Sequence, residues 1–264
     1  MYLPVPSQPD CLSAWREAVR VVDAAKGHEA HNVIIDVANP RARATMADPA
    51  VAAVSAFLAN KQKKPIETVA NTIFPAALAR RYGAPELFDV FRDAVLPKVR
   101  LKEAWSGYYF ERMMQLPGPD GKPINQIWGI VERLRNPKFA SLNKFELSVF
   151  DPVRDVNDSS FGGQCLSFAS LKLVGPKGAR RLSMTAMYRN HFYIEKLLGN
   201  LIGLGRLLEF IARQGGVPVG SLTVVSTHAL IDMDNWNRGE LTTLLAKSDQ
   251  ASAQLAAAAA AAAA

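Results

Sequence analysis

Cysteine is scarce in this chain of 264 residues, which contains only Cys11 and Cys165. Two cysteines so far apart argue against a disulfide framework and against a zinc site, and they favour a reducing compartment. The first residues lack the basic stretch and the apolar run of a secretory signal. No apolar run reaches the roughly 18 residues that span a bilayer. We therefore expect a cytoplasmic protein without a membrane association and without a bound metal.

Long runs of like charge are missing as well. The net charge is +7, yet no stretch holds five consecutive basic residues, and the densest cluster is Lys61-Gln62-Lys63-Lys64. Aromatic and basic residues do not alternate as they do in proteins that bind single-stranded nucleic acid. A positive net charge suits nucleic acid, a phosphate group or an acidic metabolite equally. Nucleic acid is the weakest of these alternatives, and an affinity that falls steeply with salt would reveal it.

Apolar residues, in contrast, are plentiful: 49% of the chain is hydrophobic, which is enough for a large core. We expect a single domain over residues 1–250. The alanine-rich tail over residues 251–264 fits neither a membrane span nor a packed segment. We expect this tail to be disordered or to stand for residues of unassigned identity.

The spacing of apolar residues separates helices from strands. Asp48-Pro49 is a typical helix start, with a capping aspartate before a proline in the first turn, and Pro97 is expected to stop the helix that begins at Ala84. Helices that come early and strands that come late, in mixed order, predict an α+β fold with one large mixed β-sheet flanked by helices. The predicted helices cover residues 12–26, 49–60, 65–74, 84–95, 126–135 and 194–211, and the predicted strands cover residues 32–37, 145–150, 165–173, 181–188 and 221–227.

Two of these strands flank a short Gly-Pro-Lys-Gly segment at residues 175–178, as in a β-hairpin. If these residues form the turn, Cys165 lies opposite Tyr188 and beside Arg189 at the open end of the hairpin. A guanidinium beside a thiol favours the thiolate, which is the nucleophilic form of cysteine. The alternative is that Cys165 is a small buried hydrophobic residue, as most lone cysteines in apolar strands are.

Residues with chemically useful side chains come before and after this cysteine in a definite order. A glutamate lies in the helix that starts near residue 65, a glycine and tyrosines come next, and polar residues open the strand before the cysteine. An arginine ends the hairpin, an asparagine lies in the next helix, and a histidine ends the last strand. In chain order these positions are Glu67, Gly107-Tyr108-Tyr109, Arg133 to Pro137, Asn143-Lys144, Cys165, Arg189, Asn200 and His228. From residue 12 to about residue 235, this succession resembles thymidylate synthases and the related pyrimidine nucleotide hydroxymethylases.

The resemblance implies a thymidylate synthase-like fold and a chemistry centred on Cys165. The cysteine thiolate would add to C6 of a pyrimidine, and C5 would become a carbanion that attacks a one-carbon electrophile. The electrophile implied is 5,10-methylenetetrahydrofolate, and the product is a C5-methyl or C5-hydroxymethyl nucleotide. Glu67 would manage protons around C5 and O4 through ordered water. Without the resemblance, Glu67 is an ordinary solvated helix residue.

Other residues would hold a pyrimidine nucleoside monophosphate. Arg189, with Lys144 and either Arg41 or Arg43, would bind the phosphate, because a guanidinium offers paired hydrogen bonds. Arg41 and Arg43 are otherwise solvated loop residues. The amide of Asn200 can donate and accept at once, which suits the O4 and N3–H edge of uracil, whereas an aspartate there would suit cytosine.

Two further residues complete the implied site. His228 would bind the sugar, and Tyr109, in the aromatic segment over residues 105–110, is a candidate for substrate contact. The structural alternatives are that His228 is a strand-end histidine with local partners and that the aromatic segment belongs to the core. The resemblance also implies a homodimer with shared active sites, in which Asn143 and Lys144 reach across to the other subunit.

The chain departs from the family mainly where folate would bind. Leu166 stands where the family has a histidine after the cysteine, and Phe192 replaces the aspartate that grips the pterin. No counterpart of the segment that closes over folate follows Asn237. The nucleotide half of the site is therefore better preserved than the folate half. This leaves open a second hypothesis, a catalytically degenerate protein of this fold that binds nucleotides or regulates. His191 is expected to be structural.

Overall fold

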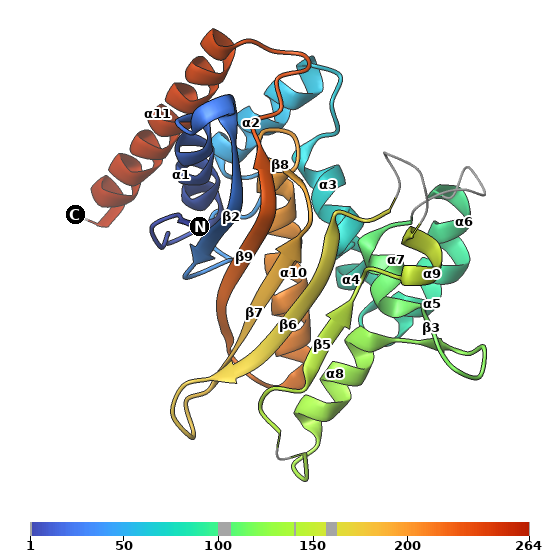
Figure 1. Ribbon diagram of the computed structural model, residues 1–264. Coiled ribbons are helices and arrows are strands. Elements are labelled where there is room, and N and C mark those ends of the chain that lie inside the picture. Colours follow the sequence, from blue (N-terminus) through green and yellow to red (C-terminus); the bar gives the residue numbers. More distant parts are fainter. Residues whose placement is uncertain (1, 100–106, 140, 157–162, 264) are drawn as a thin grey trace.

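The computed structural model describes residues 2–99, 107–139, 141–156 and 163–263 (Figure 1). Over these ranges the predicted α+β fold with one large mixed β-sheet flanked by helices is confirmed. The helices are α1 (Cys11–Asp23), α2 (Pro49–Asn60), α3 (Ile66–Ile73), α4 (Ala76–Tyr82), α5 (Glu86–Val90), α6 (Leu96–Val99), α7 (Tyr109–Met114), α8 (Gln126–Arg135), α9 (Pro152–Asp155), α10 (Leu197–Gly215) and α11 (Arg238–Ala263). The strands are β1 (Leu3–Pro4), β2 (Glu29–Val37), β3 (Leu116–Pro117), β4 (Pro123–Ile124), β5 (Phe145–Ser148), β6 (Leu166–Val174), β7 (Arg181–Tyr188), β8 (His191–Phe192) and β9 (Val219–Leu230).

Within the described ranges, seven strands form the large sheet, in the order β1-β2-β9-β7-β6-β5, and β8 pairs with β9. β6 and β7 are antiparallel because a hairpin joins them, whereas β7 and β9 are parallel because the chain crosses over through α10. The end of β7, the end of β9 and the start of β6 therefore meet at one edge of the sheet. This edge brings Cys165, Arg189 and His228 into one region.

Local signals predicted some helix boundaries and missed one. Asp48 caps α2 by accepting hydrogen bonds from two first-turn backbone N–H groups, at 2.9 and 3.3 Å. α10 ends at Gly216, whose left-handed φ of 72° suits glycine. The stop predicted at Pro97 is wrong, because a π-helical segment (Phe91–Val95) leads directly into α6. Pro97 lies in α6 directly after this π-helical segment, and its missing N–H removes one hydrogen bond without ending the helix.

The predicted hairpin forms, but its register differs from the expected one. The turn is longer than expected and covers residues 175–180. The longer turn displaces the pairing by two residues, and the irregularity between Leu166 and Phe168 reverses one of them, so that Leu166 rather than Cys165 faces Tyr188. The carbonyl of Cys165 accepts a hydrogen bond of 2.9 Å from the backbone N–H of Arg189. The cysteine thus still lies beside Arg189.

Glycines let α10 approach α3 closely. A Cβ atom at Gly199 would lie 2.6 Å from Cβ of Val69, and one at Gly203 would lie 2.8 Å from the carbonyl oxygen of Ala70. Only a residue without a side chain permits such backbone proximity. This contact sets the distance between α3 and the next residue of α10, Asn200.

One face of the sheet is packed against helices, and the other is open. In Figure 1, α1 and α10 lie behind the strands, and no helix of the described ranges crosses the near face of β7 and β9. The strand register aligns Ile34, Val225, Met187 and Phe168 across β2, β9, β7 and β6. None of these four side chains is buried, and Met187 is 40% exposed. They form an apolar row across the open face.

The apolar pattern does not predict the last helix. α11 packs against α2 and continues through residue 250. The Arg16 guanidinium ties α1 to it by donating to Ser252 Oγ at 2.8 Å and to the Ser248 carbonyl at 3.2 Å. The division into a domain over residues 1–250 and a tail stays a prediction. None of the described helices combines the length and the apolar character that a bilayer span requires.

Candidate functional site

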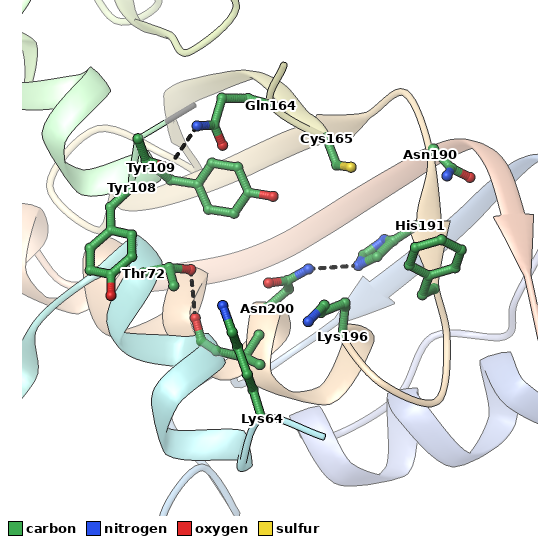
Figure 2. A pocket seen from close by; sticks show the side chains of 13 residues that line it. Lys64, Thr72, Tyr108, Tyr109, Gln164, Cys165, Asn190, His191, Lys196 and Asn200 are labelled. Carbon is green, nitrogen blue, oxygen red and sulfur yellow. Dashed lines mark hydrogen bonds between the residues drawn. The ribbon is translucent and has the colours of Figure 1, made fainter. Parts of the chain in front are cut away.

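A cavity of about 270 Å³ opens at the sheet edge where β6 begins and β7 ends (Figure 2). Its walls come from α3 and the loop before it, the segment at the start of α7, the residues before β6, the loop between β7 and α10, and α10. Of the described residues that line it, two are lysines and none is acidic. The lining residues are Lys64, Val69, Thr72, Gly107, Tyr108, Tyr109, Gln164, Cys165, Asn190, His191, Phe192, Lys196 and Asn200.

Cys165 is half-buried, and its sulfur points into this cavity (Figure 2). Burial raises the pKa of its thiol, and the cations of Arg189 and Lys196 act in the opposite direction. Arg189 is held next to the cysteine because its Nε donates to the carbonyl of Gln164 at 3.1 Å. The two cations therefore offset part of the effect of burial on the thiol pKa, at a position where a ligand can reach the sulfur.

Tyr109 approaches the same sulfur from the start of α7 (Figure 2). Burial raises the pKa of its phenol, as does the neighbouring Cys165, while backbone N–H groups of Leu166 and Cys165 oppose the rise. The ring also meets Tyr188 edge-on, with centroids 6.4 Å apart. Tyr109 therefore stays a neutral proton donor beside the thiol. Of the aromatic segment 105–110, residues 105 and 106 lie outside the described residues.

Asn200 and His191 form a buried polar pair at the back of the cavity. Nδ2 of Asn200 lies 2.9 Å from Nε2 of His191, and Nδ1 of His191 lies 3.0 Å from Oγ of Ser226. The hydroxyl of Tyr193 is within 3.2 Å of the same Oγ. Burial lowers the pKa of His191 to about 3, so its ring is neutral at physiological pH. Such a network holds Asn200 in place.

Several residues that line this cavity were not predicted from the sequence, among them two lysines and a threonine. Lys64 ends the basic cluster before α3, and Lys196 lies one helical turn before Asn200, with its Nζ 2.5 Å from Glu195. Thr72 lines the cavity from α3 and hydrogen-bonds the carbonyl of Val69 at 2.7 Å. The spacing from Lys196 to Asn200 is the one signal that predicts a shared helix face.

Glu67 does not line the cavity. Its two oxygens each accept a hydrogen bond of 2.8 Å from the guanidinium of Arg206, on the outer side of α10. The residues of α3 that do line the cavity are Val69 and Thr72. Successive helix residues are about 100° apart, so Glu67 lies roughly 200° around α3 from Val69. The glutamate therefore faces away from Cys165.

Arg41 and Arg43 also lie away from the described cavity walls. Nε of Arg41 pairs with Glu209 at 3.0 Å on the surface of α10. Arg43 is half-buried and donates from Nε to Asp48 at 2.6 Å, which orients the aspartate that caps α2. Both arginines are thus engaged in ion pairs that hold the loop before α2.

His228 lies behind the wall of the cavity, and Lys144 lies far from the cavity. Nδ1 of His228 is 2.8 Å from Oδ1 of Asn190, a lining residue, and Nε2 is 3.2 Å from Glu29. His228 therefore contacts the cavity wall from behind. Lys144 is exposed before β5, at the end of the sheet opposite to Cys165. Within one subunit, the fold does not bring Lys144 to the cysteine.

The chain is similar in sequence to known proteins. No protein-family model matches the chain. Three archaeal proteins, each named "Putative thymidylate synthase", are similar to it. The protein of Methanocaldococcus jannaschii is 27% identical over 176 residues, which cover 63% of this chain and 76% of the relative. The protein of Methanopyrus kandleri is 27% identical over 161 residues (56% and 70%), and that of Methanococcoides burtonii is 26% identical over 121 residues (46% and 52%).

Proposed function

Because the chain is a divergent member of the thymidylate synthase family, distantly homologous to these archaeal proteins, we propose that it acts at C5 of a pyrimidine nucleoside monophosphate. The thiolate of Cys165 adds to C6 of the base, and the electrons of the C5–C6 double bond move toward C5 and O4. C5 then bonds to the carbon of a one-carbon donor and loses its proton, and the carrier part of the donor leaves the new carbon. Addition of a hydride, which the donor would have to supply, gives a C5-methyl nucleotide, and addition of water gives a C5-hydroxymethyl nucleotide. In both cases the sulfur departs and the C5–C6 double bond is restored.

One observation carries this proposal: Cys165, Tyr109 and Asn200, which lie in separate parts of the sequence, converge on one cavity. A nucleophile, a proton donor and a group that recognises an amide-like edge are the parts that such an addition needs. The cavity, at about 270 Å³, lies near the lower end of the usual range for ligand sites, roughly 300 to 1,000 Å³. This size suits a mononucleotide.

The charge of the cavity supports an anionic substrate. Lys64 and Lys196 are its charged described lining residues, and Arg189 lies beside Cys165. We assign the phosphate to these three cations, and the sugar to Asn190 with His228 behind it. Ion pairs engage Glu67, Arg41 and Arg43 elsewhere, so the proposal gives these three residues no chemical role.

The family implies 5,10-methylenetetrahydrofolate as the one-carbon donor, and the residues present do not fit a pterin held in the family's manner. Phe192 lines the cavity at the position where the family has the gripping aspartate. No other described lining residue supplies a carboxylate for the ring N–H groups of a pterin. The donor is therefore proposed from the family alone, and the addition of Cys165 to C6 does not depend on it.

Release of tritium from C5-labelled uridine or cytidine monophosphate, in the ribose or deoxyribose form, tests the proposal. It is measured with and without methylenetetrahydrofolate, because addition to C6 activates C5 before any carbon arrives. We expect release by the parent protein and complete loss in Cys165→Ala. Cys11→Ala is the matched control, because Cys11 is fully buried away from the cavity and keeps the chemistry intact. Absence of release from every nucleotide by the parent would overturn the proposal.

The second candidate is a nucleotide-binding protein without turnover. Phe192 and the absence of acidic groups among the described lining residues favour it, because both weaken the folate half of the site. Calorimetry then shows nucleotide binding that methylenetetrahydrofolate does not change, together with no tritium release. Binding that the folate strengthens would instead favour the enzyme.

We also propose a homodimer built on the apolar row Ile34, Val225, Met187 and Phe168. A partly exposed apolar strip across the open face of a sheet is typical of an interaction surface. The family's subunits pack through their sheets. In a symmetric dimer of this chain, the apolar row of one subunit would pack against the apolar row of the other. Lys144 would then supply charge to the other subunit's phosphate site.

A further inference from the structure

A second cavity, of about 260 Å³, lies at the end of the sheet opposite to Cys165. Its walls come from the loop after β2, the end of α3, α4 and the second half of α10. β2 is antiparallel to β9, so this loop leaves the sheet at the end where β9 begins. Arg213, which lines the cavity from α10, is about 20 Å along the helix from Asn200. The two cavities share no described lining residue, so they are separate.

The lining of this second cavity is strongly basic. Of its described lining residues, four are arginines and one is acidic: Arg41, Arg80, Arg206, Arg213 and Glu209. Carboxylates neutralise two of the arginines. Arg206 pairs with Glu67 at 2.8 Å. Nε of Arg41 lies 3.0 Å from Glu209. The other two arginines therefore carry the net positive charge of the cavity.

These two arginines, Arg80 and Arg213, come from different elements. Arg80 lies on α4 and Arg213 lies in the last turn of α10, and both are exposed. Neither has a carboxylate partner within the part of the chain that the structure describes. An arginine stays charged at every physiological pH. Two such cations beside one cavity repel each other, and a bound ligand with two negative charges would remove this repulsion.

The floor of the cavity is apolar. Phe74 and Phe210 line it and are each 3% exposed, and their ring centroids are 4.9 Å apart. Ala44, Ala76 and Ala79 also line it and are buried. Sites for small organic ligands combine such apolar walls with a few charged or polar groups. An inorganic anion would leave this floor unused, so the lining favours an anion with an apolar body.

Packing holds the walls in place without a ligand. A Cβ atom at Gly205 would lie 2.5 Å from the carbonyl oxygen of Pro40, so the loop after β2 rests directly on α10. Sγ of Cys11 donates to the same oxygen at 3.3 Å. The cavity is therefore a feature of the free protein.

We propose that this cavity binds a small organic phosphate, with the phosphate group at Arg80 and Arg213 and the apolar body over Phe74 and Phe210. A phosphate monoester carries close to two negative charges at neutral pH, whereas a carboxylate carries one. Its oxygens can also accept paired hydrogen bonds from each guanidinium. This ligand is distinct from a substrate of Cys165, which lies at the other end of the sheet, and its binding does not depend on the proposed function.

Phenyl phosphate is the probe, titrated by calorimetry into the whole protein in a buffer free of phosphate. We expect saturable binding that Arg80→Met and Arg213→Met each weaken by roughly tenfold or more, because each removes charged hydrogen bonds but keeps an apolar stem. Inorganic phosphate should bind at least about tenfold more weakly than the probe, because it leaves the apolar floor exposed to water.

Two variants serve as controls. Arg81→Met removes the neighbouring charge on α4, which stacks on Tyr82 at 5.3 Å and does not line the cavity, so it should leave the affinity unchanged. Lys196→Met removes a cation of the cavity at Cys165. The binding that Arg80→Met and Arg213→Met weaken should persist in Lys196→Met.

Three results would overturn the inference. They are no saturable binding of phenyl phosphate by the parent, equal affinities in the parent, Arg80→Met and Arg213→Met, and binding that only Lys196→Met weakens. Release of tritium from a labelled nucleotide is measured separately and reports on Cys165. A failure of the second site therefore leaves the proposed function standing, and the reverse also holds.

Discussion

The two cysteines show how one residue type acquires opposite properties within the same fold. Cys11 is fully buried at the start of α1, where burial raises the pKa of its thiol far above the ordinary value and its sulfur contacts the Pro40 carbonyl at 3.3 Å. Cys165 is half-buried, and two cations oppose the effect of its burial. Thiolate character and access together set the reactivity of cysteine. We therefore expect only Cys165 to react in the native protein.

Alkylation by iodoacetamide at neutral pH measures this difference. Cys165 should be labelled and Cys11 should not. Lys196→Met should slow the labelling of Cys165 by roughly threefold or more, because the loss of a nearby cation raises the thiol pKa. Lys63→Met is the control, since Lys63 shares the partner Glu195 at 3.3 Å but does not act on the thiol. An unchanged rate in Lys196→Met would contradict the electrostatic account.

Two buried groups give opposite dependences of stability on pH. Burial lowers the pKa of His191 to about 3 and raises that of Asp232 to about 6. Between about pH 4.5 and 6, this histidine binds a proton in the unfolded chain but not in the native protein. The free energy of unfolding therefore falls as the pH falls. In the same window native Asp232 holds a proton that the unfolded chain lacks, so stability rises with falling pH. The two effects oppose each other in the parent.

Urea unfolding over this window separates them. Asp232→Asn should leave the contribution of His191, a loss of stability on acidification of at most about 1.4 kcal/mol per pH unit. His191→Gln should leave the contribution of Asp232, a gain on acidification. The parent should lie between the two slopes. Parallel curves for the two variants would show that neither group has the protonation state that its burial implies.

The contact between α3 and α10 is the element-scale feature on which the cavity depends. α3 supplies Val69 and Thr72 to the lining, and α10 supplies Asn200. Gly199 allows the two helices to touch, because an added Cβ would come within 2.6 Å of Val69. A neighbour inside a packed core cannot move away cheaply. The width of the cavity is therefore set by a glycine that makes no contact with a ligand.

Gly199→Ala should destabilise the protein by about 1 to 3 kcal/mol, the usual cost of overpacking, and should weaken nucleotide binding as α3 shifts. Gly129→Ala in α8 is the control, because no atom lies within 4 Å of the added Cβ. The control should be neutral or stabilising by up to about 1 kcal/mol. Chemical denaturation and calorimetry give both quantities. Equal stabilities of the two variants would contradict a tight contact between the helices at Gly199.

The open face of the sheet is the feature that matters for the whole molecule. A sheet covered by helices on one side leaves its other side to water or to a partner. The apolar row on this face crosses four strands, and its exposure in a single subunit is unfavourable. A homodimer would bury the row and bring Lys144 of one subunit toward the other.

Sedimentation equilibrium tests the dimer. The chain has a mass of 28.8 kDa, so a dimer has twice that mass. Met187→Arg, in the middle of the row, should yield the single-chain mass and reduce any activity that needs the partner's Lys144. Val153→Arg is the control, because Val153 is 90% exposed on α9, and it should leave the mass unchanged. A parent protein with the mass of one chain would refute the homodimer.

The site was predictable where its parts are close in sequence. Cys165 and Arg189 share a hairpin, and even an error in register leaves them adjacent. The helix cap at Asp48 was predictable from the dipeptide Asp48-Pro49 alone. Glu67 illustrates the limit, because the periodicity of α3 shows that the helix has an apolar face but does not show which polar neighbour faces the cavity. The ion pair with Arg206, 139 residues away, is what separates Glu67 from the cysteine.

By itself, the sequence determined the class of fold, the hairpin that pairs a thiol with a cation, and the absence of a cysteine framework, because apolar spacing, turn residues and composition act locally. Only the tertiary structure decided which residues share the cavity. Lys64 and Lys196 line it, and His191 contacts both Asn200 and Ser226, the latter 35 residues away from the histidine. These outcomes depend on the rotation of helices and on the order of strands in the sheet, which are set by packing between distant segments.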